Sequence, residues 1–125
     1  FMLVTNQLEL SVSELKHFED GSVDLCHENE MPLMAWSPLA GGRLFKDERY
    51  APLREKLAEI AEKIGAKEID EVAYAWLLKH PARIMPIVGS GKIERIESAV
   101  RSTNLSLTRE QWFEILKASR GRDVD

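Results

Sequence analysis

The sequence predicts an α/β fold with a parallel sheet that is buried on both faces. Three short, nearly continuous apolar segments are separated by long connections, and the last two of them by amphipathic helical patterns. Parallel strands need such crossover connections, because a tight turn cannot join two strands that run in the same direction. The chain has 125 residues and is 44% hydrophobic, which is enough for one globular unit with its own core.

The predicted strands are Met2–Glu9, Leu33–Trp36 and Ile84–Val88. Proline and paired glycines follow the second one and close it. Three parallel strands leave sheet edges that an autonomous domain would have to pair or cover. The sequence therefore predicts a piece of a larger sheet. The first residue, Phe1 rather than methionine, adds the expectation that only part of a longer chain is present.

The helices are predicted from apolar residues at intervals of three and four and from their end signals. In order, they are a short helix capped by Ser22, one from Pro52 to a C-terminal glycine at Gly65, one from Ile69 to Lys79, one from Lys92 to Arg101, and one opened by the Thr108–Gln111 capping box and ended by Gly121. Ile93, Ile96 and Val100 share one side of the fourth helix.

Composition excludes several functions. With 17 basic and 21 acidic residues the net charge is −4, which argues against a general binder of nucleic acid or of an anionic membrane. No apolar run approaches the roughly 20 residues that span a bilayer, and no signal peptide is seen. The single cysteine, Cys26, excludes an internal disulfide and suits a reducing compartment, so a cytoplasmic location is expected.

Two stretches directly after predicted strands contain residues suited to binding, at the strand ends where parallel sheets bind ligands. In AWSPLAGG, Trp36 can present a flat face to a ring, and the small residues let backbone N–H groups approach an anion. In VGSGKIER, two glycines, a serine hydroxyl, Lys92 and Arg95 precede or open a helix, as in a phosphate cradle. A tight turn with a capped helix behind it is the alternative.

Together, Asn6-Gln7, AWSPLAGG and PIVGSGKIER resemble the aldo-keto reductases, and the resemblance runs through all 125 residues. It implies the C-terminal part of a (β/α)₈ TIM barrel, namely the last three strands and their helices, with the N-terminal part of that single domain absent from this chain. It also implies an NADP(H)-dependent oxidoreductase that passes a hydride to an aldehyde or ketone, with a small carbonyl compound as substrate.

The resemblance assigns cofactor contacts residue by residue. Gln7 would hold the nicotinamide carboxamide and Trp36 would stack on the nicotinamide ring. Ser37, Leu39 and Gly41 would line the pyrophosphate, and Gly89, Ser90, Lys92 and Arg95 would lie at the adenosine ribose and its 2′-phosphate. This chain departs from the family at Ser98 and Ala99, where many members carry an acidic residue and an asparagine that contact the adenine.

The family's catalytic aspartate, tyrosine, lysine and histidine lie on earlier strands, so no catalytic residue is expected in this chain, and the chain alone is expected to be inactive. Its expected partner is the remainder of its own barrel, or another copy of itself if it is truncated. Two alternatives stay open: a non-catalytic cofactor-binding or regulatory module of the same superfamily, and a self-contained α/β unit with an interaction role.

Other conspicuous side chains are expected to be structural. His17, His27 and His80 lack the spacing of metal ligands, so no metal site is predicted. Tyr74, Trp76, Trp112 and Cys26 are expected to pack on apolar helix faces. Tyr50 is expected in a loop, and a contact of its side chain with cofactor or substrate stays open as an alternative.

Overall fold

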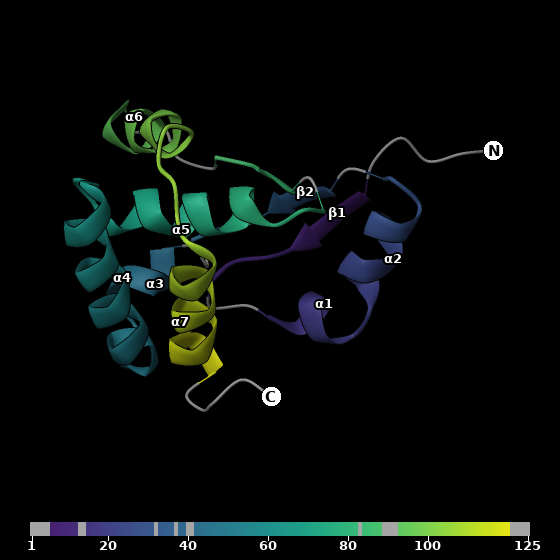
Figure 1. Cartoon of the computed structure of the whole chain (residues 1–125), viewed down its shortest axis with the longest axis horizontal. Helices are drawn as coiled ribbons and strands as arrows, with labels where there is room; N and C mark the ends of the chain where they lie inside the picture. The colour runs from purple at the N-terminus through teal and green to yellow at the C-terminus, as the bar shows by residue number, and fades with distance from the viewer. Residues whose placement is uncertain are drawn as a thin grey trace.

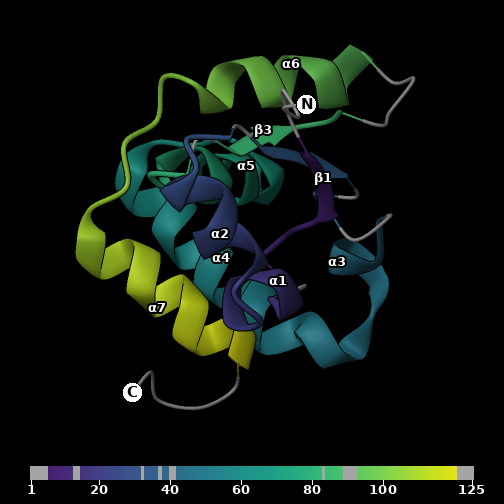
Figure 2. The same cartoon turned by 90° about the vertical axis from the view of Figure 1, so that its right-hand side faces the viewer.

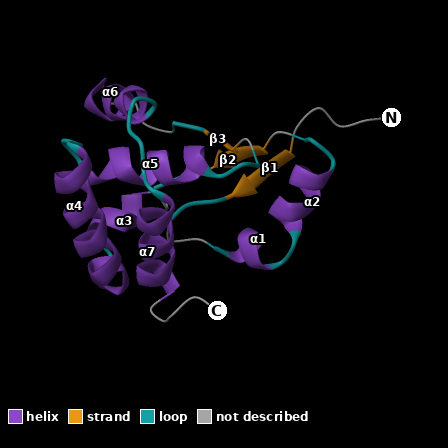
Figure 3. Ribbon diagram, viewed as in Figure 1, coloured by secondary structure: helices purple, strands orange, loops and turns teal. Residues whose placement is uncertain are grey.

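The computed structural model describes residues 6–12, 15–31, 33–36, 38–39, 42–82, 84–88 and 93–120. Its strands, β1 (Asn6–Glu9), β2 (Leu33–Trp36) and β3 (Ile84–Pro86), form one parallel sheet in the order β1-β2-β3. In register, Gln7 lies opposite Met34, and Met34 lies opposite Met85. The predicted parallel sheet is therefore confirmed, and Figure 3 shows its strands side by side.

Helices surround this small sheet. They are α1 (Lys16–Glu19), α2 (Ser22–Glu28), α3 (Arg43–Lys46), the 3₁₀ turn η2 (Glu48–Tyr50), α4 (Ala51–Ile64), α5 (Ile69–Lys79), α6 (Ile93–Ser102) and α7 (Arg109–Arg120). Figure 1 shows α3, α4, α5 and α7 grouped on one side and α1 and α2 on the other, with the strands between them. Figure 2 shows α6 at the top of the molecule, well apart from α7.

The predicted strand bounds are met in β2, and the third strand is shorter than predicted. Met2–Thr5, which the sequence assigns to the first strand, lie outside the described residues. The third strand ends at Pro86 instead of Val88. One further backbone bond, from the Ile87 N–H to the Ala35 carbonyl at 2.9 Å, extends the pairing beyond it.

Local end signals account for most helix bounds. α5 has the predicted bounds, and Gly65 ends α4 with a φ of +78°, a left-handed conformation that favours glycine. At the start of α7, the Thr108 N–H donates to Gln111 Oε1 (2.9 Å) and the Gln111 N–H donates to Thr108 Oγ1 (3.1 Å). The predicted capping box is thus confirmed, while Gly121 lies outside the described residues.

The predicted cap of the second helix is wrong by one position. Ser22 is the first residue of α2, and the N-cap position is occupied by Gly21, with a φ of +90°. The acceptor that the helix start needs comes from further back, because the Asp20 carboxylate accepts the Ser22 N–H at 2.8 Å. The serine hydroxyl is therefore not the capping group.

The core is centred on a pair of tryptophans from α5 and α7. The rings of Trp76 and Trp112 are stacked, with centroids 4.6 Å apart and planes 7° from parallel. Each indole N–H donates to the other residue's main-chain carbonyl, at 3.0 and 2.9 Å. Phe18 of the α1 helix meets the Trp76 ring edge-on at 5.4 Å. The prediction that both tryptophans are core anchors is confirmed.

The apolar side of α6 does not reach this core. Ile93, Ile96 and Val100 are 66%, 43% and 62% exposed. The side of α6 that is buried carries Ser98 and Ser102 instead. The helix is therefore held to the rest of the described chain mainly by its polar side. Among the described residues no helix is both long and apolar enough to cross a membrane.

We predict that Trp76→Phe in the full-length protein lowers the free energy of unfolding by about 1–3 kcal/mol, because it leaves the Trp112 carbonyl without its donor and removes stacked ring area. Equilibrium urea unfolding measures the change. Leu25→Ala, at a side chain 61% exposed on α2, is the matched control and should stay within about 0.5 kcal/mol of wild type. Equal losses in both variants would contradict the anchor role.

Candidate functional site

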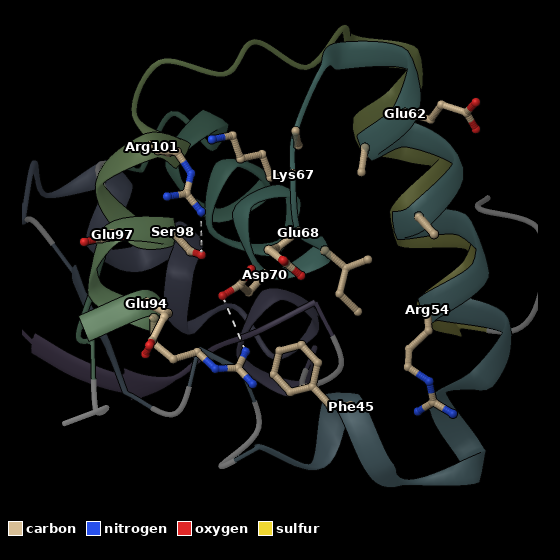
Figure 4. A pocket seen from close by; sticks show the side chains of 15 residues that line it. Phe45, Arg54, Glu62, Lys67, Glu68, Asp70, Glu94, Glu97, Ser98 and Arg101 are labelled. Atoms are coloured by element: carbon tan, nitrogen blue, oxygen red, sulfur yellow. Dashed lines mark hydrogen bonds and ion pairs between the residues drawn. The ribbon is translucent and has the colours of Figure 1, made fainter. Parts of the chain in front are cut away.

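A pocket of about 960 Å³ opens between α3, α4, the start of α5 and α6. Because α3 follows β2 and α6 follows β3 in the chain, the pocket lies on the side where the strands end. Figure 4 shows the side chains that these elements contribute, with Asp70 near the centre of the group and Glu62 pointing outward from α4. The lining residues are Phe45, Arg54, Ala58, Ala61, Glu62, Ala66, Lys67, Glu68, Ile69, Asp70, Glu94, Arg95, Glu97, Ser98 and Arg101.

The residues predicted for cofactor binding are only partly within the described structure. Arg95 lies in the first turn of α6 and lines the pocket. Trp36 is the last residue of β2 and is 45% exposed, and Leu39 is partly buried against the core. Gln7 lies in β1, but its side chain is not described. The other five, Ser37, Gly41, Gly89, Ser90 and Lys92, lie outside the described residues.

A tight turn after β2 leads the chain towards the pocket. The Gly42 N–H donates to the Leu39 carbonyl at 3.0 Å. Gly42 has a φ of +89°, and a Cβ there would meet nothing within 4 Å, so the backbone conformation rather than crowding favours glycine. α3 starts at the next residue and places Phe45 in the lining.

Two adjacent carboxylates at the start of α5 hold α6. Asp70 and Glu71 are each 2% exposed. Asp70 Oδ2 lies 3.4 Å from Arg95 Nη1, and Glu71 Oε1 accepts from Arg101 Nε at 3.0 Å. Each arginine side chain remains 36% exposed. These paired contacts fix the position of α6 against α5.

Sequence reasoning did not find this arrangement. Acidic residues in a first helical turn ordinarily indicate an exposed position that favours the helix dipole. The only available signal was the presence of two arginines, Arg95 and Arg101, on a helix whose apolar side is elsewhere. Nothing in the sequence pairs them with Asp70 and Glu71, which precede them by 25 and 30 residues.

Glu71 is fully engaged. Its Oε2 accepts the backbone N–H groups of Lys67 (2.9 Å) and Glu68 (2.7 Å) in a capping box that starts α5, while its Oε1 accepts from Arg101. Asp70 differs. No described residue donates a hydrogen bond to its buried Oδ1.

The Arg95 guanidinium, which contacts Asp70, also stacks on an aromatic ring. Its Cζ lies 4.1 Å from the centroid of the Phe45 ring, which is the distance of a direct cation–π contact. Ser98, one turn further along α6, is 3% exposed, and its Oγ accepts from Arg101 Nη2 at 3.1 Å. At the pocket, Arg95 therefore contacts Asp70 and Phe45, whereas Ser98 contacts Arg101.

Tyr74 follows Asp70 by one helical turn and is 3% exposed. Burial raises the pKa of its hydroxyl, the charge of Asp70 raises it further, and Arg95 acts in the opposite direction. The group therefore stays protonated at neutral pH. The expectation that Tyr74 packs in the interior is confirmed, and Cys26 is likewise buried, in α2.

His80 has a structural environment. Its Nδ1 accepts the Ala82 N–H at 3.1 Å, and its ring contacts those of Phe18 and Trp112. Burial lowers its pKa, His27 lowers it further, and Asp24 opposes them. The described residues contain no group of three or more histidine, cysteine, aspartate or glutamate side chains that could hold a metal ion. The expectation that Tyr50 lies in a loop is wrong, because Tyr50 is the last residue of the 3₁₀ helix η2 and packs partly buried against the core, with Arg49 over its ring at 5.4 Å.

Comparison with known proteins assigns this architecture. A sequence model described as the Aldo/keto reductase family matches residues 1–120. The oxidoreductase YcsN of Bacillus subtilis is 51% identical over 124 residues, covering 98% of this chain and 41% of that protein. The oxidoreductase YdhF of Escherichia coli is 48% identical over 124 residues, covering 99% and 42%. A 6-dehydroglucose reductase of Agrobacterium fabrum is 38% identical over 122 residues, covering 98% and 40%.

A solved structure agrees. It is a thermostable aldo-keto reductase in complex with the inhibitor epalrestat, with a TM-score of 0.81 and 26% identity, covering 94% of this chain and 40% of that one. The fold predicted from the sequence, an α/β part of an aldo-keto reductase, is confirmed. The chain spans 40–42% of the length of the curated relatives named above.

His80 makes the stability of the protein depend on pH. An unfolded histidine titrates near 6.5, and the folded pKa is lower, so its contribution to stability is complete above pH 6.5 and is lost as the pH falls through the folded pKa. We predict that the fall in urea midpoint from pH 7.5 to pH 5 is smaller in His80→Asn, whose amide oxygen can still accept the Ala82 N–H. Identical falls in the two proteins would refute this assignment.

Proposed function

The chain belongs to the aldo/keto reductase family, and we propose that the protein containing it is an NADP(H)-dependent oxidoreductase that reduces an aldehyde or ketone by hydride transfer. In this proposal the chain is the C-terminal part of a single (β/α)₈ barrel and binds the cofactor. The rest of the barrel supplies the catalytic residues, so this chain alone is inactive. A cytoplasmic location belongs to the same proposal, and the buried thiol of Cys26 suits a reducing compartment.

The observation that carries the proposal is the position of Arg95. It lies in the first turn of α6, directly after the β3–α6 junction, and lines the pocket while remaining 36% exposed. A guanidinium has five N–H donors, so Arg95 can keep its contact with Asp70 and still donate to a phosphate. The helix N-terminus beside it favours an anion as well.

The exposure of Trp36 supports the nicotinamide end of the proposal. A tryptophan at the carboxyl end of a parallel strand that is 45% exposed leaves ring surface for a ligand to cover. β1, which contains Gln7, is its neighbour, with Glu9 opposite Trp36 in register. The two residues proposed to hold the nicotinamide therefore come from adjacent strands.

The exposed apolar surface supports the barrel part of the proposal. In the described part of the chain, β1 and β3 each pair only with β2, and Met85 of β3 is 45% exposed. The apolar side of α6 is also exposed. Further strands and helices of a closed barrel would pair these edges and cover these side chains.

We predict that in the full-length protein Lys92→Met raises KM for NADPH at least about tenfold and leaves KM for NADH unchanged. The lost charge-assisted contact to the 2′-phosphate contributes about 1.5–3 kcal/mol, and about 1.4 kcal/mol corresponds to a factor of ten. Absorbance at 340 nm over a panel of aldehydes and ketones gives both constants. Lys79→Met, at an exposed lysine of the last turn of α5, is the control and should behave as wild type.

The results of these measurements distinguish the proposed function from the proposed role of Lys92. No NADPH oxidation with any carbonyl compound, together with no binding of NADPH in a fluorescence titration, would overturn the proposed function. Activity with an unchanged KM in Lys92→Met would keep the oxidoreductase and remove Lys92 from the phosphate site.

We also predict that the 125-residue chain, produced alone, self-associates, because its sheet edges and the apolar side of α6 are uncovered. Size-exclusion chromatography with light scattering should show species larger than the 14.2 kDa monomer. The full-length protein is the comparison and should be monodisperse. A monodisperse, cooperatively unfolding 14.2 kDa chain would count against the barrel proposal and favour a self-contained unit.

A further inference from the structure

We propose that Asp70 is the residue that recognises the 6-amino group of the cofactor's adenine, with the base inserted between Phe45 and Arg95. The proposal rests on the proposed function and adds a specificity-determining residue to it. The resemblance to the family assigns recognition of the base to residues of α6. In this proposal the base is recognised by a residue in the first turn of α5 instead.

The first observation is the unsatisfied oxygen of Asp70. Asp70 and Glu71 are neighbours on the same helix, and both are 2% exposed. Glu71 accepts from two backbone N–H groups and from Arg101. Asp70 binds Arg95 through Oδ2 only, and its Oδ1 is buried without a donor from any described residue. Such an oxygen retains its desolvation cost until a donor reaches it.

The second observation concerns the hydrogen-bonding groups that α6 presents to the pocket. Ser98 and Ala99 occupy the positions at which the resemblance expects side chains that contact the base. The Ser98 hydroxyl already accepts from Arg101 Nη2 at 3.1 Å, and an alanine methyl group has no hydrogen-bonding atom. Asp70 lines the same pocket, and its Oδ1 is a buried acceptor to which no described residue donates.

The third observation is the stack that covers this end of the pocket. Phe45 and the Arg95 guanidinium are in direct contact, 4.1 Å from centroid to Cζ. A flat base between them needs about 7–8 Å, twice the optimal carbon–carbon separation. The pair therefore has to open to admit the base, and the base then gains a stacking surface on each side. Arg95 stays oriented during this opening because Asp70 Oδ2 holds it.

The charges around the pocket suit a neutral ring rather than a phosphate in its interior. Four cationic side chains (Arg54, Lys67, Arg95 and Arg101) alternate with five acidic ones (Glu62, Glu68, Asp70, Glu94 and Glu97) in the lining. Figure 4 shows Asp70 in the first turn of α5, Lys67 and Glu68 in the segment just before that helix, and Glu94, Glu97 and Ser98 on α6. Of the five acids only Asp70 is buried, so an anion placed next to its carboxylate would be repelled, whereas an amino group would be attracted to it.

The chemistry of the base makes the proposal selective. The 6-amino group of adenine is a donor, and a carboxylate oxygen is only an acceptor. Hypoxanthine has the same shape with an acceptor oxygen at that position. It would bring two acceptors together at Oδ1, and a polar site rejects a ligand that cannot pair its groups more strongly than it rejects a change of size.

The experiment compares NADPH with its hypoxanthine analogue in the full-length protein. Dissociation constants come from the quenching of tryptophan fluorescence, and kcat/KM comes from hydride transfer to one active carbonyl substrate. Wild type is expected to bind NADPH about ten to a hundred times more tightly than the analogue. In Asp70→Asn the side-chain amide can donate to the hypoxanthine oxygen, so the preference is expected to be abolished or inverted.

Two controls separate recognition from a structural effect. Glu71→Gln weakens the other α5–α6 contact at a residue that does not itself line the pocket, and it should affect both dinucleotides by the same factor. Glu55→Gln, at an exposed acid of α4 away from the pocket, should affect neither.

Equal binding of the two dinucleotides by wild type would overturn the proposal for Asp70 even if Asp70→Asn failed to fold, while NADPH binding would leave the proposed function intact. An unchanged preference in a folded Asp70→Asn would also overturn it. Absence of NADPH binding in wild type would instead overturn the proposed function on which this inference rests.

Discussion

Two neighbouring carboxylates at the start of α5 each bind an arginine of α6, Asp70 with Arg95 and Glu71 with Arg101. The pocket depends on these contacts, because α6 forms one of its walls and brings no apolar side chain of its own into the core. Ser98 and Ser102 are the buried residues of α6, and serines offer little apolar area to bury. The direction in which α6 leaves the sheet is therefore set by charge rather than by hydrophobic packing.

This way of attaching a helix has an energetic consequence. Removing a carboxylate from water costs several kcal/mol, and a buried pair recovers this cost only when the remaining acceptor sites are filled. Glu71 meets that condition with three donors, whereas Asp70 does not. The arginines stay 36% exposed, which reduces the Coulomb attraction through solvent screening. The gain from these contacts lies more in the orientation of the guanidinium groups than in stability.

The sequence predicts the parts of the fold that local signals determine. β2 and α5 have the predicted bounds because a short apolar run and a proline mark their ends, and Gly65 ends α4 where glycine alone readily adopts the observed backbone. The cap of α2 is missed because Asp20 and Ser22 are equally plausible acceptors until the chain path is known. A periodic pattern shows that α6 has an apolar side, but not whether this chain covers it.

The residues that form the pocket are harder to predict, because a sequence pattern does not show which distant segments pack together. Arg95 could be identified as a phosphate ligand from its place after a strand, since that argument uses only chain order. Asp70 and Phe45 are 25 and 50 residues away from it and join it only through the packing of α3 and α5. Sequence reasoning identifies an arginine that can bind, whereas the fold determines what the arginine lies against.

α6 consequently has two faces of different chemistry. One is polar, fixed to α5, and lines the pocket, while the other carries Ile93, Ile96 and Val100 and is exposed. In the proposed barrel the second face is covered by segments outside this chain, and covering it would not disturb the first, because the arginine contacts are made on the opposite side. The adenosine end of the cofactor would then be held by contacts internal to this chain. Hydride transfer would depend on residues that the rest of the barrel provides, so binding and chemistry would be separable by mutation.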